Sequence, residues 1–127
     1  TSPIKERIHA IGYRNDVLSC IKACDIYVQP SLKEGLGRSL IESMMLAKPV
    51  IATRAGAMPD LVKHMETGIL VPRKDPKALA GAIKKLAGDA NLRKNLAQNG
   101  KAFVHDFLSM GKYVNGVEKM YYRLAGE

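Results

Sequence analysis

The sequence has no tryptophan and few aromatic residues of any kind, which make up 6% of its 127 residues. Single-stranded nucleic acids bind by stacking their bases on aromatic side chains, and this composition offers little surface of that type. The sequence also contains no apolar run long enough to span a bilayer and no segment of the signal-peptide type. We therefore expect neither a protein that stacks nucleic-acid bases nor one that crosses a membrane.

Cysteine is equally scarce, and the two that are present lie four positions apart, at Cys20 and Cys24. In a helix this spacing places both thiols on one face. Two thiols without a neighbouring histidine or further cysteine make a poor metal site, so we expect no metal. Buried free thiols are the favoured interpretation, and they indicate a reducing compartment such as the cytoplasm.

Basic residues outnumber acidic ones, 20 to 12, for a formal net charge of +8. The surplus is typical of a solvated basic surface, but it also suits an anionic partner: a nucleotide, an acidic acceptor or an anionic lipid surface. Contact with the cytoplasmic face of a membrane therefore stays open. A DNA-binding function would rest on this charge alone, and we expect no nucleic-acid partner.

The remaining composition, 46% hydrophobic and 25% charged, is that of a single globular domain. Short β-branched runs alternate with segments of helical periodicity, which predicts βαβ units and a parallel sheet. The fold class we predict is α/β: a Rossmann-like parallel sheet of about four strands with flanking helices and extra C-terminal helices. The predicted strands are residues 8–11, 25–29, 49–53 and 69–71. One predicted helix is capped by Asn15 or Asp16 and runs to about residue 23, and two more span residues 38–47 and 58–63. Further helices are predicted to start at Asp75-Pro76, with Asp75 as the N-cap and Pro76 at the first helical position, and near residues 89 and 109.

The loop from Ser31 to Gly37 follows a predicted strand and leads into a predicted helix. Ligands of open parallel sheets bind outside the carboxyl ends of the strands, where this loop would lie. Gly35 and Gly37 allow the backbone to approach a ligand closely. The amides of the following helical turn lack intrahelical acceptors and carry partial positive charge, which suits a phosphate, and Arg38 adds a full charge there.

Two carboxylates flank this phosphate-binding turn, Glu34 on the loop and Glu42 on the helix. An ionised carboxylate accepts two hydroxyl hydrogen bonds, and a vicinal sugar diol donates two. The pair is therefore suited to holding sugars on either side of a diphosphate. The alternative is that Glu34 is a solvated loop residue and that Glu42 only suits the positive end of a helix.

These residues belong to a longer pattern that resembles the signature of retaining GT-B glycosyltransferases of family 4. The resemblance runs from about Ile8 to Tyr122 and consists of several blocks in the same order as in that family. The blocks are Pro30-Ser31-x-x-Glu34-Gly35-Leu36-Gly37 with a second glutamate at Glu42, Lys48-Pro49-Val50-Ile51-Ala52-Thr53, Gly56-Ala57-Met58-Pro59-Asp60-Leu61-Val62, and Thr67-Gly68-Ile69-Leu70-Val71-Pro72.

The resemblance implies a role for each matching position, with Glu34 as the catalytic-site residue that contacts the donor sugar. The backbone at Gly35, Leu36 and Gly37 would contact the sugar and phosphate. The amides of Arg38 and Ser39 would hold the diphosphate, and Glu42 the ribose. Such enzymes need no metal or other cofactor in the site. Leu36 stands where the family usually has phenylalanine, and Arg38 and Ser39 stand where apolar residues are common.

The resemblance also implies parts that this sequence does not contain. Family members have an N-terminal acceptor domain, and an arginine and a lysine that grip the diphosphate, at positions that would precede Thr1. We therefore expect residues 1–127 to be a single partial nucleotide-sugar-binding domain that is inactive alone. Its parent would transfer a sugar from a UDP- or GDP-sugar to an acceptor. The alternative is a non-catalytic nucleotide-sugar-binding or interaction module.

Overall fold

The computed structural model describes residues 4–32 and 37–109. Its centre is a parallel sheet of three strands in the order β1 (Tyr27–Gln29), β2 (Val50–Thr53), β3 (Ile69–Val71). Val28 pairs with Ile51, and Ala52 pairs with Leu70. The parallel α/β architecture predicted from the sequence is confirmed, and the three strands lie within the ranges predicted for them.

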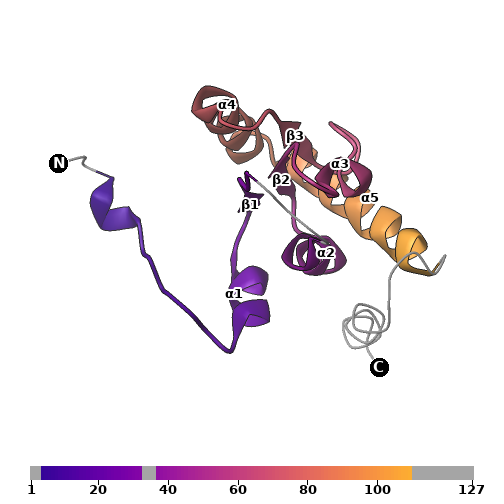
Figure 1. Ribbon diagram of the computed structural model, residues 1–127, viewed down its shortest axis with the longest axis horizontal. Helices are drawn as coiled ribbons and strands as arrows, with labels where there is room; N and C mark the ends of the chain where they lie inside the picture. The colour runs from indigo at the N-terminus through magenta and orange to yellow at the C-terminus, as the bar shows by residue number, and fades with distance from the viewer. Residues whose placement is uncertain (1–3, 33–36, 110–127) are drawn as a thin grey trace.

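Helices cover both faces of this sheet (Figure 1). Because side chains alternate along a strand, Val50 and Ala52 pack toward one face and Ile51 toward the other. The first face is covered by α2 (Arg38–Met45), α3 (Met58–Leu61) and the C-terminal half of α5 (Ala90–Ser109). The second face is covered by α4 (Pro76–Ala87) and the start of α5. Strand β2 is therefore buried along its whole length.

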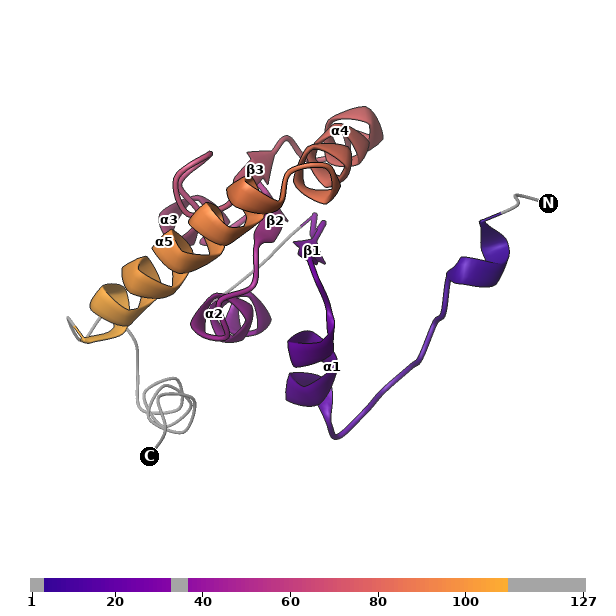
Figure 2. The same ribbon diagram turned by 180° about the vertical axis from the view of Figure 1, so that it is seen from behind.

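The strand predicted at residues 8–11 does not form, so the prediction of about four strands is wrong for the described residues. The chain there begins with a 3-10 helix, η1 (Lys5–Arg7), continues as irregular chain, and enters helix α1 (Val17–Ala23). Both views show this segment running away from the sheet (Figures 1 and 2). Ile8 and Ile11 are 67% and 57% exposed. Their β-branched side chains favour a strand, but no strand in the described part of the chain lies beside them to complete the hydrogen-bond ladder.

Helix α4 begins as its sequence predicts, with Asp75 at the N-cap and Pro76 at the first helical position. The Asp75 carboxylate accepts a hydrogen bond from the amide of Ala78 at 2.9 Å. Asp89 caps α5 in the same way, through the amide of Leu92 at 2.9 Å. Ser109 is the last residue of α5, and the helix predicted to follow it lies outside the described residues. None of the described helices is both long and apolar enough to cross a membrane.

Helix α2 ends in a left-handed residue that is not glycine. Ala47 has a φ of 56°. Its amide donates to the carbonyl of Met44 at 3.0 Å, and the amide of Lys48 donates to the carbonyl of Ser43 at 3.0 Å. This pair of bonds is the Schellman motif, which usually has glycine at the position that Ala47 occupies. The Cβ of Ala47 therefore adds steric strain to the end of the helix that carries the candidate site.

Ala47→Gly is accordingly expected to raise the free energy of unfolding by about 1 kcal/mol, because glycine adopts the left-handed conformation without a Cβ clash. The matched control is Ala80→Gly at an exposed position inside α4, which should lower stability by about 1 kcal/mol through lost helix propensity. Urea denaturation of both variants measures the two changes. If Ala47→Gly lowered stability as much as Ala80→Gly does, the inference that the Cβ of Ala47 strains the end of α2 would be wrong.

Candidate functional site at the start of helix α2

Helix α2 begins on the carboxyl side of β1 without a side-chain cap. Its N-cap residue, Gly37, is left-handed, with φ 74° and ψ 40°, and supplies no capping group. The first intrahelical bond runs from the amide of Ile41 to the carbonyl of Gly37 at 2.9 Å. The amides of Arg38, Ser39 and Leu40 therefore have no acceptor within the helix. With the helix dipole, they form a positively polarised turn suited to an anion.

The position of this turn is set by contacts from β1 and α3. A Cβ on Gly37 would lie 2.6 Å from the Met58 Cε and 3.2 Å from the Leu61 Cδ1, so the backbone of Gly37 rests against α3. The Gln29 side-chain amide donates to the Met58 sulfur at 3.9 Å, and the Tyr27 hydroxyl donates to the Gln29 Oε1 at 2.6 Å. A chain of contacts thus links β1 to the start of α2. The residue pattern alone did not reveal it.

The structure places four of the seven predicted site residues. Arg38 and Ser39 are exposed on the first turn of α2, with Gly37 buried just before them. Glu42 is half-buried on the same helix, one turn further along. The other three predictions, Glu34, Gly35 and Leu36, lie outside the described residues.

Two side chains hold the segment that enters the loop, and neither was singled out from the sequence. The Thr53 hydroxyl donates to the carbonyl of Ser31, and the Arg73 guanidinium donates to the carbonyl of Leu32 at 3.1 Å. Thr53 ends β2, and Arg73 follows β3 closely. The segment after β1 is therefore tied to the carboxyl ends of both other strands. The sequence indicates these two residues only by their position, because each is a polar residue at or just after the end of a predicted strand.

Cations gather at this carboxyl edge. Arg38 begins α2, Arg54 follows β2, and Arg73 and Lys74 follow β3. Within the described residues none of them forms an ion pair, since the ion pairs found there join Arg14 to Asp16 and His105 to Asp106. In the described residues this edge therefore carries four basic side chains outside ion pairs, which favours anionic ligands.

Metal-binding clusters and catalytic histidines are not apparent in the part of the chain that the structure describes. No group of three or more histidine, cysteine, aspartate or glutamate residues there could hold a metal ion. His64 is structural: its Nδ1 accepts a hydrogen bond from the amide of Leu70 at 3.1 Å. His105 lies 3.7 Å from the Asp106 carboxylate, on the exposed side of α5.

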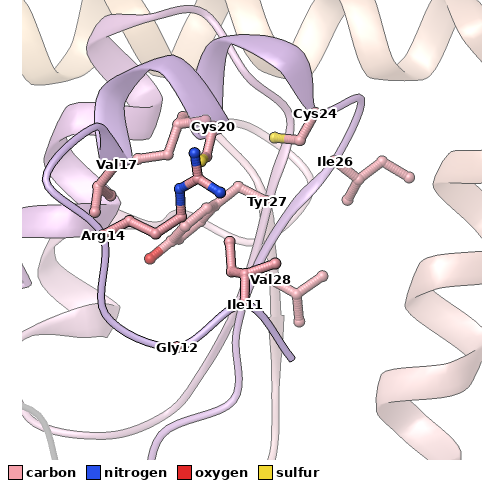
Figure 3. Close-up of a pocket in the computed structure, with 10 residues that line it drawn as sticks. Ile11, Gly12, Arg14, Val17, Cys20, Cys24, Ile26, Tyr27 and Val28 are labelled. Carbon is pink, nitrogen blue, oxygen red and sulfur yellow. The ribbon is translucent and has the colours of Figure 1, made fainter. Parts of the chain in front are cut away.

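Ionisable groups near α1 have perturbed pKa values for local reasons. Arg14 makes two hydrogen bonds to the Asp16 carboxylate, at 2.6 and 2.8 Å, which lower the pKa of Asp16 and raise that of Arg14. Asp16 occupies the N-cap of α1, one of the two positions predicted for it, but its carboxylate makes no capping bond to the helix. Burial raises the pKa of the Cys24 thiol. Cys20 and Cys24, shown in Figure 3, are unpaired as predicted, although they are half-buried rather than buried.

Three comparisons identify proteins that this chain is similar to. The sequence model of the family described as Glycosyl transferases group 1 matches residues 2–103. An uncharacterized glycosyltransferase of Methanocaldococcus jannaschii is 39% identical over 111 residues, which cover 87% of this chain and 31% of that protein. The capsular polysaccharide biosynthesis glycosyltransferase CapM of Staphylococcus aureus is 34% identical over 111 residues, 87% of this chain and 29% of that protein.

Solved structures agree with the sequence relatives. Anabaena HepE in complex with UDP superposes with a TM-score of 0.77 at 30% identity, covering 81% of this chain and 29% of that one. The C-terminal domain of the group 1 protein LpcC from Francisella tularensis gives a TM-score of 0.69 at 38% identity, covering 78% of this chain and 51% of that domain. This chain spans about a third of the length of the curated relatives. It belongs to the group 1 glycosyltransferases, with the Rossmann-like architecture of their GT-B C-terminal domain.

Proposed function

We propose that this chain is the donor-binding part of a retaining glycosyltransferase and that it holds a nucleoside-diphosphate sugar at the start of α2. The observation that carries the proposal is the first turn of α2 beside Gly37, which has no side-chain cap and lies at an edge where four described basic side chains gather. The Anabaena relative supports it, because that protein was solved with UDP and with UDP-glucose. UDP- and GDP-sugars are therefore the donors to test.

In this proposal the amides of Arg38 and Ser39 bind the diphosphate. Glu42 accepts hydrogen bonds from the ribose hydroxyls, and the Glu34–Gly37 segment contacts the donor sugar, with Glu34 in the catalytic site. Donors aimed at the departing diphosphate stabilise the charge that develops when the glycosidic bond breaks. The proposal assigns this task to amides and basic side chains, without a metal or other cofactor.

We propose that this chain alone does not bind the acceptor. The relatives are about three times as long, and we place the acceptor-binding domain in the part of the protein that this chain does not represent. The whole protein would then act in the cytoplasm, in solution or at the cytoplasmic face of a membrane. The isolated chain is expected to bind donor without transferring the sugar.

Glu42→Ala is expected to weaken UDP binding by about 10-fold to 100-fold, because hydrogen bonds to a charged group contribute about 1.5–3 kcal/mol. Isothermal titration with UDP, GDP, UDP-glucose and GDP-mannose measures the affinities of the unmodified chain and the variant. The control is Glu66→Ala, an exposed carboxylate in the loop before β3, at the opposite edge of the sheet. Thermal denaturation of each variant separates lost binding from lost folding.

The outcomes discriminate between the candidate functions. An unmodified chain that binds none of these nucleotides would contradict donor binding. Equal affinity in Glu42→Ala and the unmodified chain would contradict the role of Glu42. Nucleotide-sugar binding by a longer protein that transfers no sugar to any acceptor would favour the non-catalytic binding module instead.

A further inference from the structure

Helix α3 supports the candidate site, and the loop after α3 holds the end of that helix in place. Gly37 rests on Met58 and Leu61, the first and last residues of α3. The carbonyl of Leu61 accepts a hydrogen bond from the Thr67 hydroxyl at 3.3 Å, and the same hydroxyl accepts from the amide of Lys63 at 2.8 Å. One buried threonine thus joins the C-terminal end of α3 to the loop that leads into β3.

Helix α5 packs directly against this loop. Gly100 is buried in α5, and a Cβ there would lie 2.9 Å from the carbonyl oxygen of Thr67 and 3.5 Å from the Met44 Cε of α2. The first of these distances is shorter than real Cβ atoms come to a backbone oxygen. Both views show α5 running past α3 (Figures 1 and 2). The loop backbone therefore touches α5 at a point where only glycine leaves room.

A second link joins α3 to α5 near the surface. The Lys63 Nζ donates to the carbonyl of Pro59, inside α3, at 3.2 Å and lies 5.8 Å from the centre of the Phe103 ring. Phe103 stacks on Phe107 of the same helix, with ring centroids 5.9 Å apart. A cation near an aromatic ring is attracted by it, so Lys63 helps to hold α3 against α5.

We propose that Gly100 is a positioning residue for the donor site, because α5 sets the position of α3 and thereby that of the first turn of α2. The contacts run from Gly100 to the loop at Thr67, from Thr67 to the end of α3, and from α3 to Gly37. Donor binding as the consequence rests on the proposed function. The contacts themselves do not depend on it.

The groups along this route are closely packed. Thr67 is 6% exposed, and Met58 and Leu61 are fully buried. A packed interior has few voids that could absorb a displacement, and it therefore transmits strain. We expect a shift of the loop at Thr67 to reach the amides of Arg38 and Ser39.

Gly100→Ala inserts a Cβ at the contact, and Gly81→Ala in α4 is the matched control, because a Cβ at Gly81 meets nothing within 4 Å. Both changes place alanine inside a helix and gain the same helix propensity. NMR spectra of the nucleotide-free 127-residue chain are the first readout. The backbone amide signals of Arg38 and Ser39 are expected to shift in Gly100→Ala and to stay unchanged in Gly81→Ala. Unchanged signals in Gly100→Ala would overturn the proposal.

Titration with UDP measures the functional consequence. Substitutions along coupled residues change a binding affinity by about 2-fold to 30-fold, and Gly100→Ala is expected to weaken UDP binding within this range. Gly81→Ala should bind UDP as the unmodified chain does. Equal affinity in Gly100→Ala and the unmodified chain would overturn the positioning role. An unmodified chain that binds no UDP would instead contradict the proposed function, and the amide signals would still decide whether α5 positions α2.

Two substitutions of Thr67 test the link without a steric clash, and they decide the question if Gly100→Ala does not fold. Thr67→Val removes the hydroxyl and is expected to shift the Arg38 and Ser39 signals and weaken UDP binding, whereas Thr67→Ser keeps the hydroxyl and should restore both. Ile51→Val removes one buried methyl group on the other face of the sheet and controls for lost stability alone. Equal effects of Thr67→Val and Thr67→Ser, or of Gly100→Ala and Ile51→Val, would overturn the proposal.

Discussion

Gly37→Ala is expected to lower the free energy of unfolding by about 2–4 kcal/mol and to weaken UDP binding at least about 10-fold. Two costs add. The φ of 74° places any other residue in the left-handed region, and the new Cβ would lie 2.6 Å from the Met58 Cε and 3.2 Å from the Leu61 Cδ1. Met58 and Leu61 are fully buried, so neither side chain has solvent space to move into. Relief of the clash must shift either the buried end of the Met58 side chain or the start of α2, and a shift of α2 would displace the amides proposed to bind the diphosphate.

Gly12→Ala separates the two costs. Gly12 has a similar φ of 66°, but a Cβ there meets nothing within 4 Å. This variant should lose only about 1 kcal/mol from backbone strain and should bind UDP normally. Urea denaturation and UDP titration measure both variants. Equal stability losses at the two glycines, or unchanged UDP affinity in Gly37→Ala, would show that the packing of Gly37 against α3 does not position the site.

Thr67→Val is expected to lower the free energy of unfolding by about 2–3 kcal/mol, because it removes the hydroxyl from a buried position while keeping the shape of the side chain. Thr67 is 6% exposed. Its hydroxyl accepts from the amide of Lys63 at 2.8 Å and donates to the carbonyl of Leu61 at 3.3 Å. Valine would leave both of these backbone groups without that partner.

Thr67→Ser is the matched control, because serine retains the hydroxyl and removes only a methyl group. It should cost about 1 kcal/mol, which is the value of one buried methyl. Chemical denaturation of the two variants gives the comparison directly. A serine variant as unstable as the valine variant would show that the methyl group, not the hydroxyl, stabilises the loop.

Local signals in the sequence predicted the elements that local interactions form. The start of α2 at Arg38, the cap of α4 at Asp75 and the three strands are confirmed. Each rests on a pattern within a few residues: glycines before a helix, an aspartate before a proline, or a short β-branched run. The strand predicted at residues 8–11 had the same local pattern but lacks a neighbouring strand in the structure. Strand pairing is non-local, so propensity could not decide it.

The same distinction between local and non-local interactions applies to the candidate site. The positively polarised first turn of α2 could be predicted, because it requires only a helix that begins after Gly37. The contact of Gly37 with Met58 joins residues far apart in the sequence, as does the bond from Thr53 to Ser31. The pattern around each of these residues carries no sign of its partner. Glu34 lies outside the described residues, and its role stays a prediction.

The strand order has a consequence for how the chain folds. Each strand of the sheet pairs with its nearest neighbour in the sequence, β1 with β2 and β2 with β3. Every pairing therefore closes only a short loop containing one helix, α2 or α3. Loop-closure entropy grows with loop length, and low contact order is associated with fast folding. The βαβαβ unit can thus assemble through the shortest strand pairings that a parallel sheet allows, each one closing around a single helix.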